Sequence, residues 1–117
     1  MITSKKYHFE WNFFDLSMAL IYITCKDLKE ANKIPMLLLE KRLIACANLF
    51  PIKSMYLWKG KIENQNEFAI IAKTLEKKYI KIKAEVSKLH SYKIPCILKI
   101  DAEANEAYDN WVNDELN

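Results

Sequence analysis

Thiol and imidazole side chains are the groups in this chain best suited to bind a soft metal ion. Cys46 lies in the apolar segment 44–50, Cys96 follows a proline, and His90 follows a lysine-rich amphipathic segment. Thiolate and imidazole groups are ligands that copper and zinc accept in proteins. Each residue also has a structural alternative, because cysteine often packs as a small apolar residue and histidine often binds a free carbonyl at a helix end.

Cys25 is a separate candidate, as a reactive thiol. It ends the apolar segment 19–24 and comes directly before a predicted helix. The N-terminus of a helix can lower the pKa of a thiol. The alternative is a cysteine that only faces a loop.

A lysine and two aromatic residues are candidates for binding a small molecule. Lys73 follows the apolar run AIIA, where an inward-facing ammonium group needs a carboxylate or an anion, unless the strand end reaches solvent. Tyr56 and Trp58 can stack on a ligand or pack at a subunit interface. Arg42 and Asn48 are the residue types that an acylphosphatase site uses, so a hydrolase is a third hypothesis.

Length, charge and cysteine usage exclude several classes of protein. A chain of 117 residues is long enough for one domain with its own core. The net charge of +3 is spread over both halves without a clustered basic face, so we expect no nucleic-acid partner. Three cysteines without a Cys-x-x-Cys motif fit free thiols and the cytoplasm. No apolar run approaches the roughly 18 residues that span a bilayer, so we expect no membrane segment.

The first half of the chain predicts a strand, a helix and a strand. The strand is 19–24, and Asp27 is placed to cap the helix, which carries Pro35 and should kink or restart there. The segments 44–50 and 52–58 form the second strand. Pro51 separates them, so this strand should bulge or lie at a sheet edge.

The second half begins with a turn at Lys59-Gly60, which contains the single glycine of the chain. A strand over 62–74, a helix and a strand over 96–100 follow, and the chain ends in a short helix with Asn105 as a candidate cap. The order β-α-β-β-α-β plus a C-terminal helix predicts an α+β, ferredoxin-like split βαβ fold with an antiparallel sheet.

The strand over 62–74 also predicts an oligomer. Phe68, Ile70 and Ala72 should point to one face of the sheet, while Ala69 and Ile71 point to the other. Two helices can bury only one face. We therefore expect a second copy of the chain to cover the other.

Four ordered motifs carry a resemblance to a known family. They are KRLIACAN (41–48), YLWKGK (56–61), AKT (72–74) and HSYKIP (90–95), and together they resemble the CutA-type divalent-cation tolerance proteins. The resemblance runs from about Met18 to the C-terminus, so we expect one domain over 18–117 and an aromatic-rich extension over 1–17. We expect the extension to be an extra strand or packed arm that covers a sheet edge or the trimer rim.

The resemblance implies a ferredoxin-like homotrimer linked to tolerance of copper and other divalent cations, without an enzymatic reaction. On this hypothesis Cys46, His90 and Cys96 are the candidate metal ligands. The resemblance also implies an inter-subunit cleft at His90, Tyr92 and Lys73, where Tyr56 and Trp58 are further candidates for ligand binding. The alternative is a PII-like signalling trimer that binds a small anionic molecule there, and an unidentified protein partner also stays open.

The chain departs from the family pattern at three positions. Pro35 interrupts a helix that is normally regular. Ser91 stands where the family usually has a proline, and Cys96 stands where a glutamate commonly follows the second proline. The lost carboxylate weakens a metal site that would have used it. The thiol supplies a softer ligand, which would favour Cu(I).

Overall fold

The computed structural model describes residues 17–117, and these residues form the expected succession of elements. The order of strands and helices is that of a split βαβ fold with an added C-terminal helix, as the sequence predicts. The elements are β1 (Met18–Cys25), α2 (Leu28–Glu40), β2 (Cys46–Trp58), β3 (Lys61–Leu75), a 3-10 turn η1 (Glu76–Lys78), α3 (Tyr79–Leu89), β4 (Ile97–Ala102) and α4 (Glu106–Leu116).

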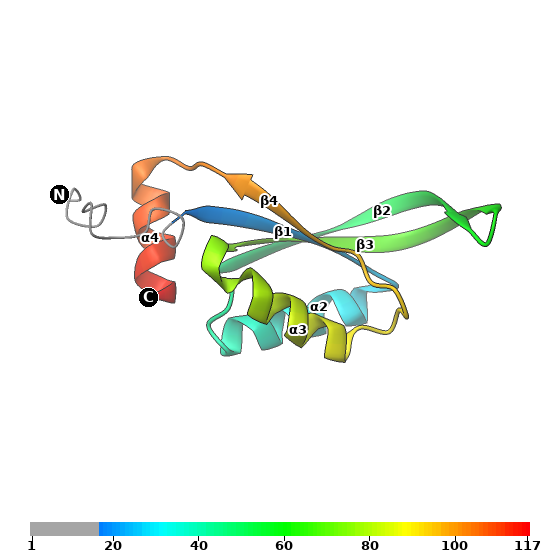
Figure 1. Cartoon of the computed structure of the whole chain (residues 1–117), viewed down its shortest axis with the longest axis horizontal. Helices are drawn as coiled ribbons and strands as arrows, with labels where there is room; N and C mark the ends of the chain where they lie inside the picture. The colour runs from blue at the N-terminus through cyan, green and yellow to red at the C-terminus, as the bar shows by residue number, and fades with distance from the viewer. Residues whose placement is uncertain (1–16) are drawn as a thin grey trace.

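The four strands form one antiparallel sheet in the order β2-β3-β1-β4. Helices α2 and α3 lie on the same face of this sheet (Figure 1). Side chains from both helices and from β1 and β3 form the main core between them, with Ile21, Ile23, Ile34, Leu38, Ile70, Ile82 and Val86 all fully buried. The predicted α+β, ferredoxin-like class is confirmed.

Helix α2 starts as the sequence predicts but does not break at its proline. The Asp27 carboxylate accepts a hydrogen bond of 2.9 Å from the Glu30 backbone N–H, which caps the helix. The helix then runs without interruption through Pro35. The predicted restart is therefore wrong. Ala31, Ile34 and Leu38 are fully buried on either side of the proline, and this packing compensates for the single missing hydrogen bond.

The prolines near β2 and β4 act differently. Pro51 lies inside β2, opposite Phe68, and β2 is an edge strand, which confirms the edge prediction. The fourth strand begins at Ile97, so Cys96 lies one residue before it and not inside it. Asn105 occupies the N-cap position of α4, but its side chain makes no capping hydrogen bond.

Strands β2 and β3 form a long hairpin that projects beyond the rest of the molecule (Figure 1). Lys59 and Gly60 form its turn with φ values of 51° and 79°, the left-handed pair of a two-residue type I′ turn. The tip of the arm is apolar and exposed, at Met55, Leu57 and Ile62.

The sheet face away from α2 and α3 is also apolar. Leu98 and Ile100 of β4 are 52% and 48% exposed on this face, beside Tyr22 and Leu20 of β1 in the strand register. The predicted two-faced apolar character of the sheet is confirmed. The oligomer that we inferred from this character, and the homotrimer that the resemblance implies, stay predictions.

Two further expectations concern membranes and the N-terminus. None of the helices in the described region has the length and apolarity to cross a membrane. Apart from Ser17, the predicted extension lies outside the described residues. The Ser17 carbonyl accepts a hydrogen bond of 2.7 Å from the Glu76 backbone N–H.

The hairpin turn yields a pair of substitutions with opposite expected effects. Gly60→Ala should lower the free energy of unfolding by about 1 kcal/mol, because a residue with a Cβ is strained at positive φ. No atom lies within 4 Å of the added Cβ, so backbone strain is the only expected cost. Lys59→Asn should raise the free energy of unfolding, since asparagine tolerates the left-handed region. Urea denaturation at one fixed protein concentration measures both. Equal effects of the two substitutions would contradict the type I′ assignment.

Candidate functional site

A cavity of about 800 Å³ lies between the base of the hairpin arm and the segment 91–96. The segment joins α3 to β4 and forms one wall, while β2 and β3 form the other. The residues that line the cavity include Thr24, Ser54, Tyr56, Trp58, Glu63, Gln65, Glu67, Ser91, Tyr92, Lys93 and Cys96.

A chain of hydrogen bonds crosses this cavity. The Tyr56 hydroxyl donates to Oε1 of Gln65 at 2.5 Å, and Nε2 of Gln65 donates to the Tyr92 hydroxyl at 3.4 Å. The Tyr92 hydroxyl in turn donates to Oε2 of Glu67. Burial and the Glu67 carboxylate both raise the pKa of Tyr92, so the phenol keeps its proton at neutral pH. The chain of hydrogen bonds therefore ends at the Glu67 carboxylate, which accepts the last hydrogen bond.

The charge of the cavity favours a cation. Two carboxylates, Glu63 and Glu67, line it with a single lysine, Lys93. The Glu67 side chain is nearly buried, yet it has no lysine or arginine partner in the region that the structure describes. Burial raises the pKa of the Cys96 thiol, and the negative charge of Glu67 makes a smaller contribution in the same direction. A metal ion that used this sulfur would have to displace its proton.

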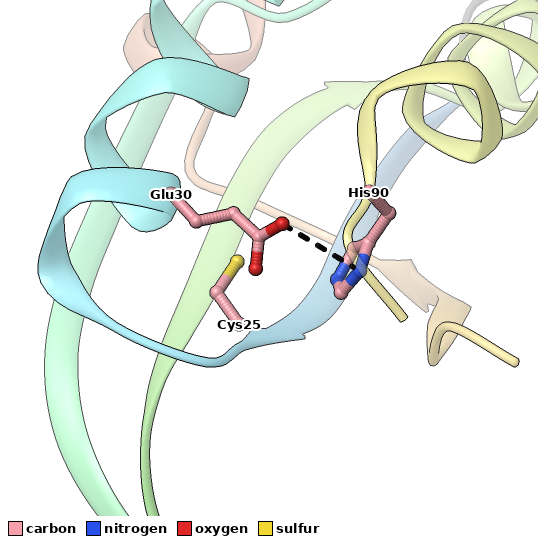
Figure 2. Close-up of side chains that lie close together, drawn as sticks. All are labelled: Cys25, Glu30 and His90. Carbon is pink, nitrogen blue, oxygen red and sulfur yellow. Dashed lines mark ion pairs between the residues drawn. The ribbon is translucent and has the colours of Figure 1, made fainter. Parts of the chain in front are cut away.

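A second group of candidate ligands is buried beneath the segment 91–96. Cys25, Glu30 and His90 come from the end of β1, the start of α2 and the residue after α3 (Figure 2). Their sulfur, oxygen and nitrogen atoms all lie within 4.8 Å of one another. The spacing alone would suit a metal ion, so the hydrogen bonds of each group decide what the cluster does.

Both nitrogens of His90 are already in use. Nε2 lies 2.7 Å from the Thr24 carbonyl, which can only accept, so Nε2 carries the proton. Nδ1 then accepts a hydrogen bond of 3.0 Å from the Tyr92 backbone N–H. The imidazole has no lone pair left for a metal in this arrangement.

Both oxygens of the Glu30 carboxylate also accept hydrogen bonds from the backbone. Oε1 accepts from the Lys26 backbone N–H at 3.1 Å, and Oε2 accepts from the Ser91 backbone N–H at 2.7 Å. Burial would raise the pKa of Glu30, but the hydrogen bonds from Ser91 and Lys26 and the nearby His90 outweigh it and hold that pKa below its ordinary value. A proline at position 91 could not donate this hydrogen bond.

Cys25 completes the cluster as an unreactive thiol. Burial raises its pKa to about 12, with further contributions from the carboxylates of Glu30, Glu67 and Asp27. Both alternatives for Cys25, a thiol with a lowered pKa and a cysteine that faces a loop, are wrong, because the side chain is fully buried in the core next to carboxylates. The cluster is best described as a structural pin that joins β1, α2 and the segment 91–96.

The structure separates the sequence-predicted site residues into three places. Tyr56, Trp58, Tyr92 and Cys96 all line the cavity, whereas the ring of His90 is buried behind its wall in the pin. Lys73 and Cys46 lie opposite each other on β3 and β2. In the strand register Lys73 pairs with Leu20 of β1, whereas His90 binds the carbonyl of Thr24, four residues further along β1. Since a strand rises about 3.3 Å per residue, Lys73 and His90 are about 13 Å apart along the strand. One chain therefore does not bring Cys46 to His90.

Two residues of the hydrolase hypothesis also have other partners. Nζ of Lys73 donates to Oδ1 of Asn48 at 2.5 Å, and Arg42 forms an exposed ion pair of 3.4 Å with Glu115. The side chains of Asn48 and Arg42 therefore contact different neighbours, which disfavours an anion site shared by these two residues.

Sequence reasoning missed Glu67 and Glu30 as site residues. Glu67 directly precedes the run FAIIA, and alternation along the strand places it on the same face as Ala69 and Ile71. A carboxylate on that largely apolar face was an available signal. The role of Glu30 was hidden, because its partner at Ser91 is 61 residues away in the sequence.

Comparisons with known proteins agree on one family. A family model described as CutA1 divalent ion tolerance protein matches residues 19–115. The divalent-cation tolerance protein CutA of Archaeoglobus fulgidus is 46% identical over 97 residues, which cover 82% of this chain and 95% of that protein. The protein of the same name from Pyrococcus horikoshii is 40% identical over 99 residues, which cover 84% of this chain and 97% of that protein.

A solved structure gives the same result for the fold. The periplasmic divalent cation tolerance protein CutA from Archaeoglobus fulgidus superposes with a TM-score of 0.83 and 44% identity. The superposition covers 86% of this chain and 99% of that chain.

The pin predicts a pH-dependent loss of stability. Glu30→Gln should lower the free energy of unfolding at pH 7 by about 1–3 kcal/mol, since the amide nitrogen would face a backbone N–H donor. The folded-state pKa of Glu30 is below its ordinary value of 4.5, so its contribution is full above that value and is lost as the pH falls through the folded-state pKa. The difference between wild type and variant should therefore shrink below about pH 4.5.

Chemical denaturation from pH 3 to pH 7 measures this difference, and Glu40→Gln is the matched control. Glu40 is an exposed glutamate of the same helix. If the control lost as much stability as Glu30→Gln, the pin would not be the cause.

Proposed function

This chain belongs to the CutA1 divalent ion tolerance family, and we propose that it takes up a divalent cation in the cavity between the hairpin and the segment 91–96. Copper is the first candidate, and another divalent cation is the alternative. The proposal is carried by one observation, which is that the carboxylate of Glu67 is nearly buried at the end of the hydrogen-bond chain from Tyr56 through Gln65 and Tyr92. A carboxylate held in this way is a fixed negative charge at the wall of a cavity.

The donors around Glu67 fit a divalent transition metal. Carboxylate oxygens, hydroxyl groups and a thiol line the cavity through Glu63, Glu67, Tyr92 and Cys96. Copper and zinc accept oxygen and sulfur ligands together. Oε2 of Glu67 accepts from Tyr92, and within the described residues Oε1 makes no hydrogen bond, so it is available to the ion. Water or a second subunit would complete the coordination.

A small anion is the less suitable ligand for this cavity. Its two carboxylates repel an anion, and Lys73 lies too far along β3 to offset them. The family is named for tolerance of divalent ions and not for a reaction, and we propose a non-enzymatic role for this chain as well.

We further propose that the working form is a homotrimer. The exposed Leu98 and Ile100 of β4 and the apolar tip of the hairpin are the surfaces that a second copy would cover. The three cysteines form no disulfide, which fits the cytoplasm, and that location stays a prediction.

The cation site can be tested with Glu67→Gln. Removing this charge should weaken the binding of Zn(II) and Cu(II) by at least about tenfold, because the carboxylate is the best-fixed donor of the cavity. Isothermal titration calorimetry of the reduced protein gives the affinity and the number of ions per chain.

Glu103→Gln is the matched control, because it removes an equal charge from an exposed position after β4. Binding that survives Glu67→Gln unchanged would rule out the cavity, and wild-type protein that binds neither ion would rule out the proposed function.

A further inference from the structure

The exposed sides of α2, η1 and α3, which face away from the sheet, form one surface that we call the outer helix surface (Figure 1). An ion pair of 2.9 Å between Lys41 and Glu85 joins the end of α2 to α3. The three elements carry seven lysines, at positions Lys29, Lys33, Lys77, Lys78, Lys81, Lys83 and Lys88. The fold thus gathers charges that the sequence spreads over both halves, and the expectation that no basic face is clustered is wrong for this surface.

The carboxylates of the same three elements do little to offset these lysines. Glu30 is buried in the pin, and Glu76 is buried where α3 begins. Glu85 is partly buried and already pairs with Lys41. Glu40 is therefore the one fully exposed carboxylate of α2, η1 and α3, and the outer helix surface is positively charged.

The lysines at the start of α3 lie close enough to repel one another. Burial lowers the pKa of Lys78, and the charges of Lys77 and Lys81 lower it further. Among residues 17–117, Lys88 is the one lysine of the seven that pairs with a carboxylate. A surface of like charges is stabilised by an anionic partner.

Uncharged side chains lie between the lysines of α3. Because the helix has 3.6 residues per turn, Ile80, Ala84 and Ser87 form a stripe opposite its buried side. All three are exposed, and Ile80 is 75% exposed. Lys83 lies on one side of this stripe and Lys81 on the other. The surface of α3 is therefore an apolar and small-residue centre with a basic rim.

Helix α2 repeats this combination. Met36 is 59% exposed, and Leu28 and Leu39 are exposed on the same half of the helix. Lys29 and Lys33 follow beside them. Helices that lie at a membrane interface combine exposed apolar residues with lysines in this way, because the stem of a lysine packs along apolar groups while its ammonium reaches the headgroups.

We propose that the outer helix surface docks on a membrane that contains anionic lipids. The ammonium groups contact the negative charges of the headgroups, and Ile80 and Met36 reach the boundary with the acyl chains. Both helices then lie along the membrane. No helix of the described residues is long and apolar enough to cross it, so the contact is peripheral.

The outer helix surface differs from the surfaces already discussed. Leu98 and Ile100, which a second copy would cover, lie on the opposite face of the sheet. No residue of α2, η1 or α3 lines the cavity, so membrane docking goes beyond the proposed cation uptake. An acidic peptide or a nucleic acid would match the charge but offers no apolar layer to Ile80 and Met36, which favours the membrane.

Vesicle flotation of the full-length protein tests the docking. The vesicles contain phosphatidylcholine alone or phosphatidylcholine with roughly one third phosphatidylserine. EDTA is present throughout, so that no divalent cation bridges protein and lipid and the result does not depend on the cation site. Binding should be at least about tenfold stronger to the anionic vesicles and should fall steeply as salt is added.

Paired substitutions locate the contact. Lys77→Gln combined with Lys81→Gln should weaken binding to anionic vesicles by at least about tenfold. Lys53→Gln combined with Lys61→Gln is the matched control, because it removes an equal charge from exposed positions of the hairpin, whose tip is also apolar. Ile80→Ser should weaken binding by about three- to tenfold and leave its salt dependence unchanged, since it removes only apolar contact.

Three results would overturn the proposal. The protein could bind neutral and anionic vesicles equally or bind neither, which would exclude recognition of anionic lipid. The hairpin control could lose as much binding as Lys77→Gln with Lys81→Gln, which would place the contact at the hairpin. The protein could also bind double-stranded DNA or polyglutamate under the same conditions while it ignores both kinds of vesicle, which would assign the surface to an acidic macromolecule.

Discussion

The hydrogen-bonded pin of Glu30 and His90 is the interaction on which the candidate site depends. It ties the start of α2 and the end of β1 to the residues that follow α3. The Tyr92 backbone N–H donates to His90, while the hydroxyl of the same tyrosine reaches across to Glu67 on β3. The pin therefore sets the distance between the two walls of the cavity. Without it, the segment 91–96 would be free to move away from the hairpin.

The same types of side chain serve two different purposes on either side of this segment. In the pin, every nitrogen and oxygen that could bind a metal is already paired with the backbone, and the thiol of Cys25 keeps its proton. In the cavity, Glu67 and Cys96 face a space open to a ligand. Buried polar groups whose hydrogen bonds are satisfied stabilise the fold. A carboxylate held at a cavity wall can instead bind a ligand. Proximity of candidate ligands alone would have pointed to the pin.

Sequence patterns predicted the fold far better than the site. Alternation and helical periodicity gave the order of elements, and Gly60 gave the hairpin, because these signals are local. The site depends on register between distant segments. Tyr56, Tyr92 and Cys96 were predicted and do line one cavity, but Glu67 was missed, since no local pattern shows that Tyr92 lies opposite it. Likewise, only the pairing of β1 with β3 shows that Lys73 and His90 are apart.

The location of a bound cation tests the account most directly. Crystals of the reduced protein soaked with Zn(II) or Cu(II), with anomalous diffraction recorded at the absorption edge of the metal, would reveal each ion by position. The account predicts an anomalous peak in the cavity within coordination distance of Glu67. A peak between Cys25, Glu30 and His90, with the cavity empty, would contradict it, because it would mean that the pin gives up its hydrogen bonds to hold the metal.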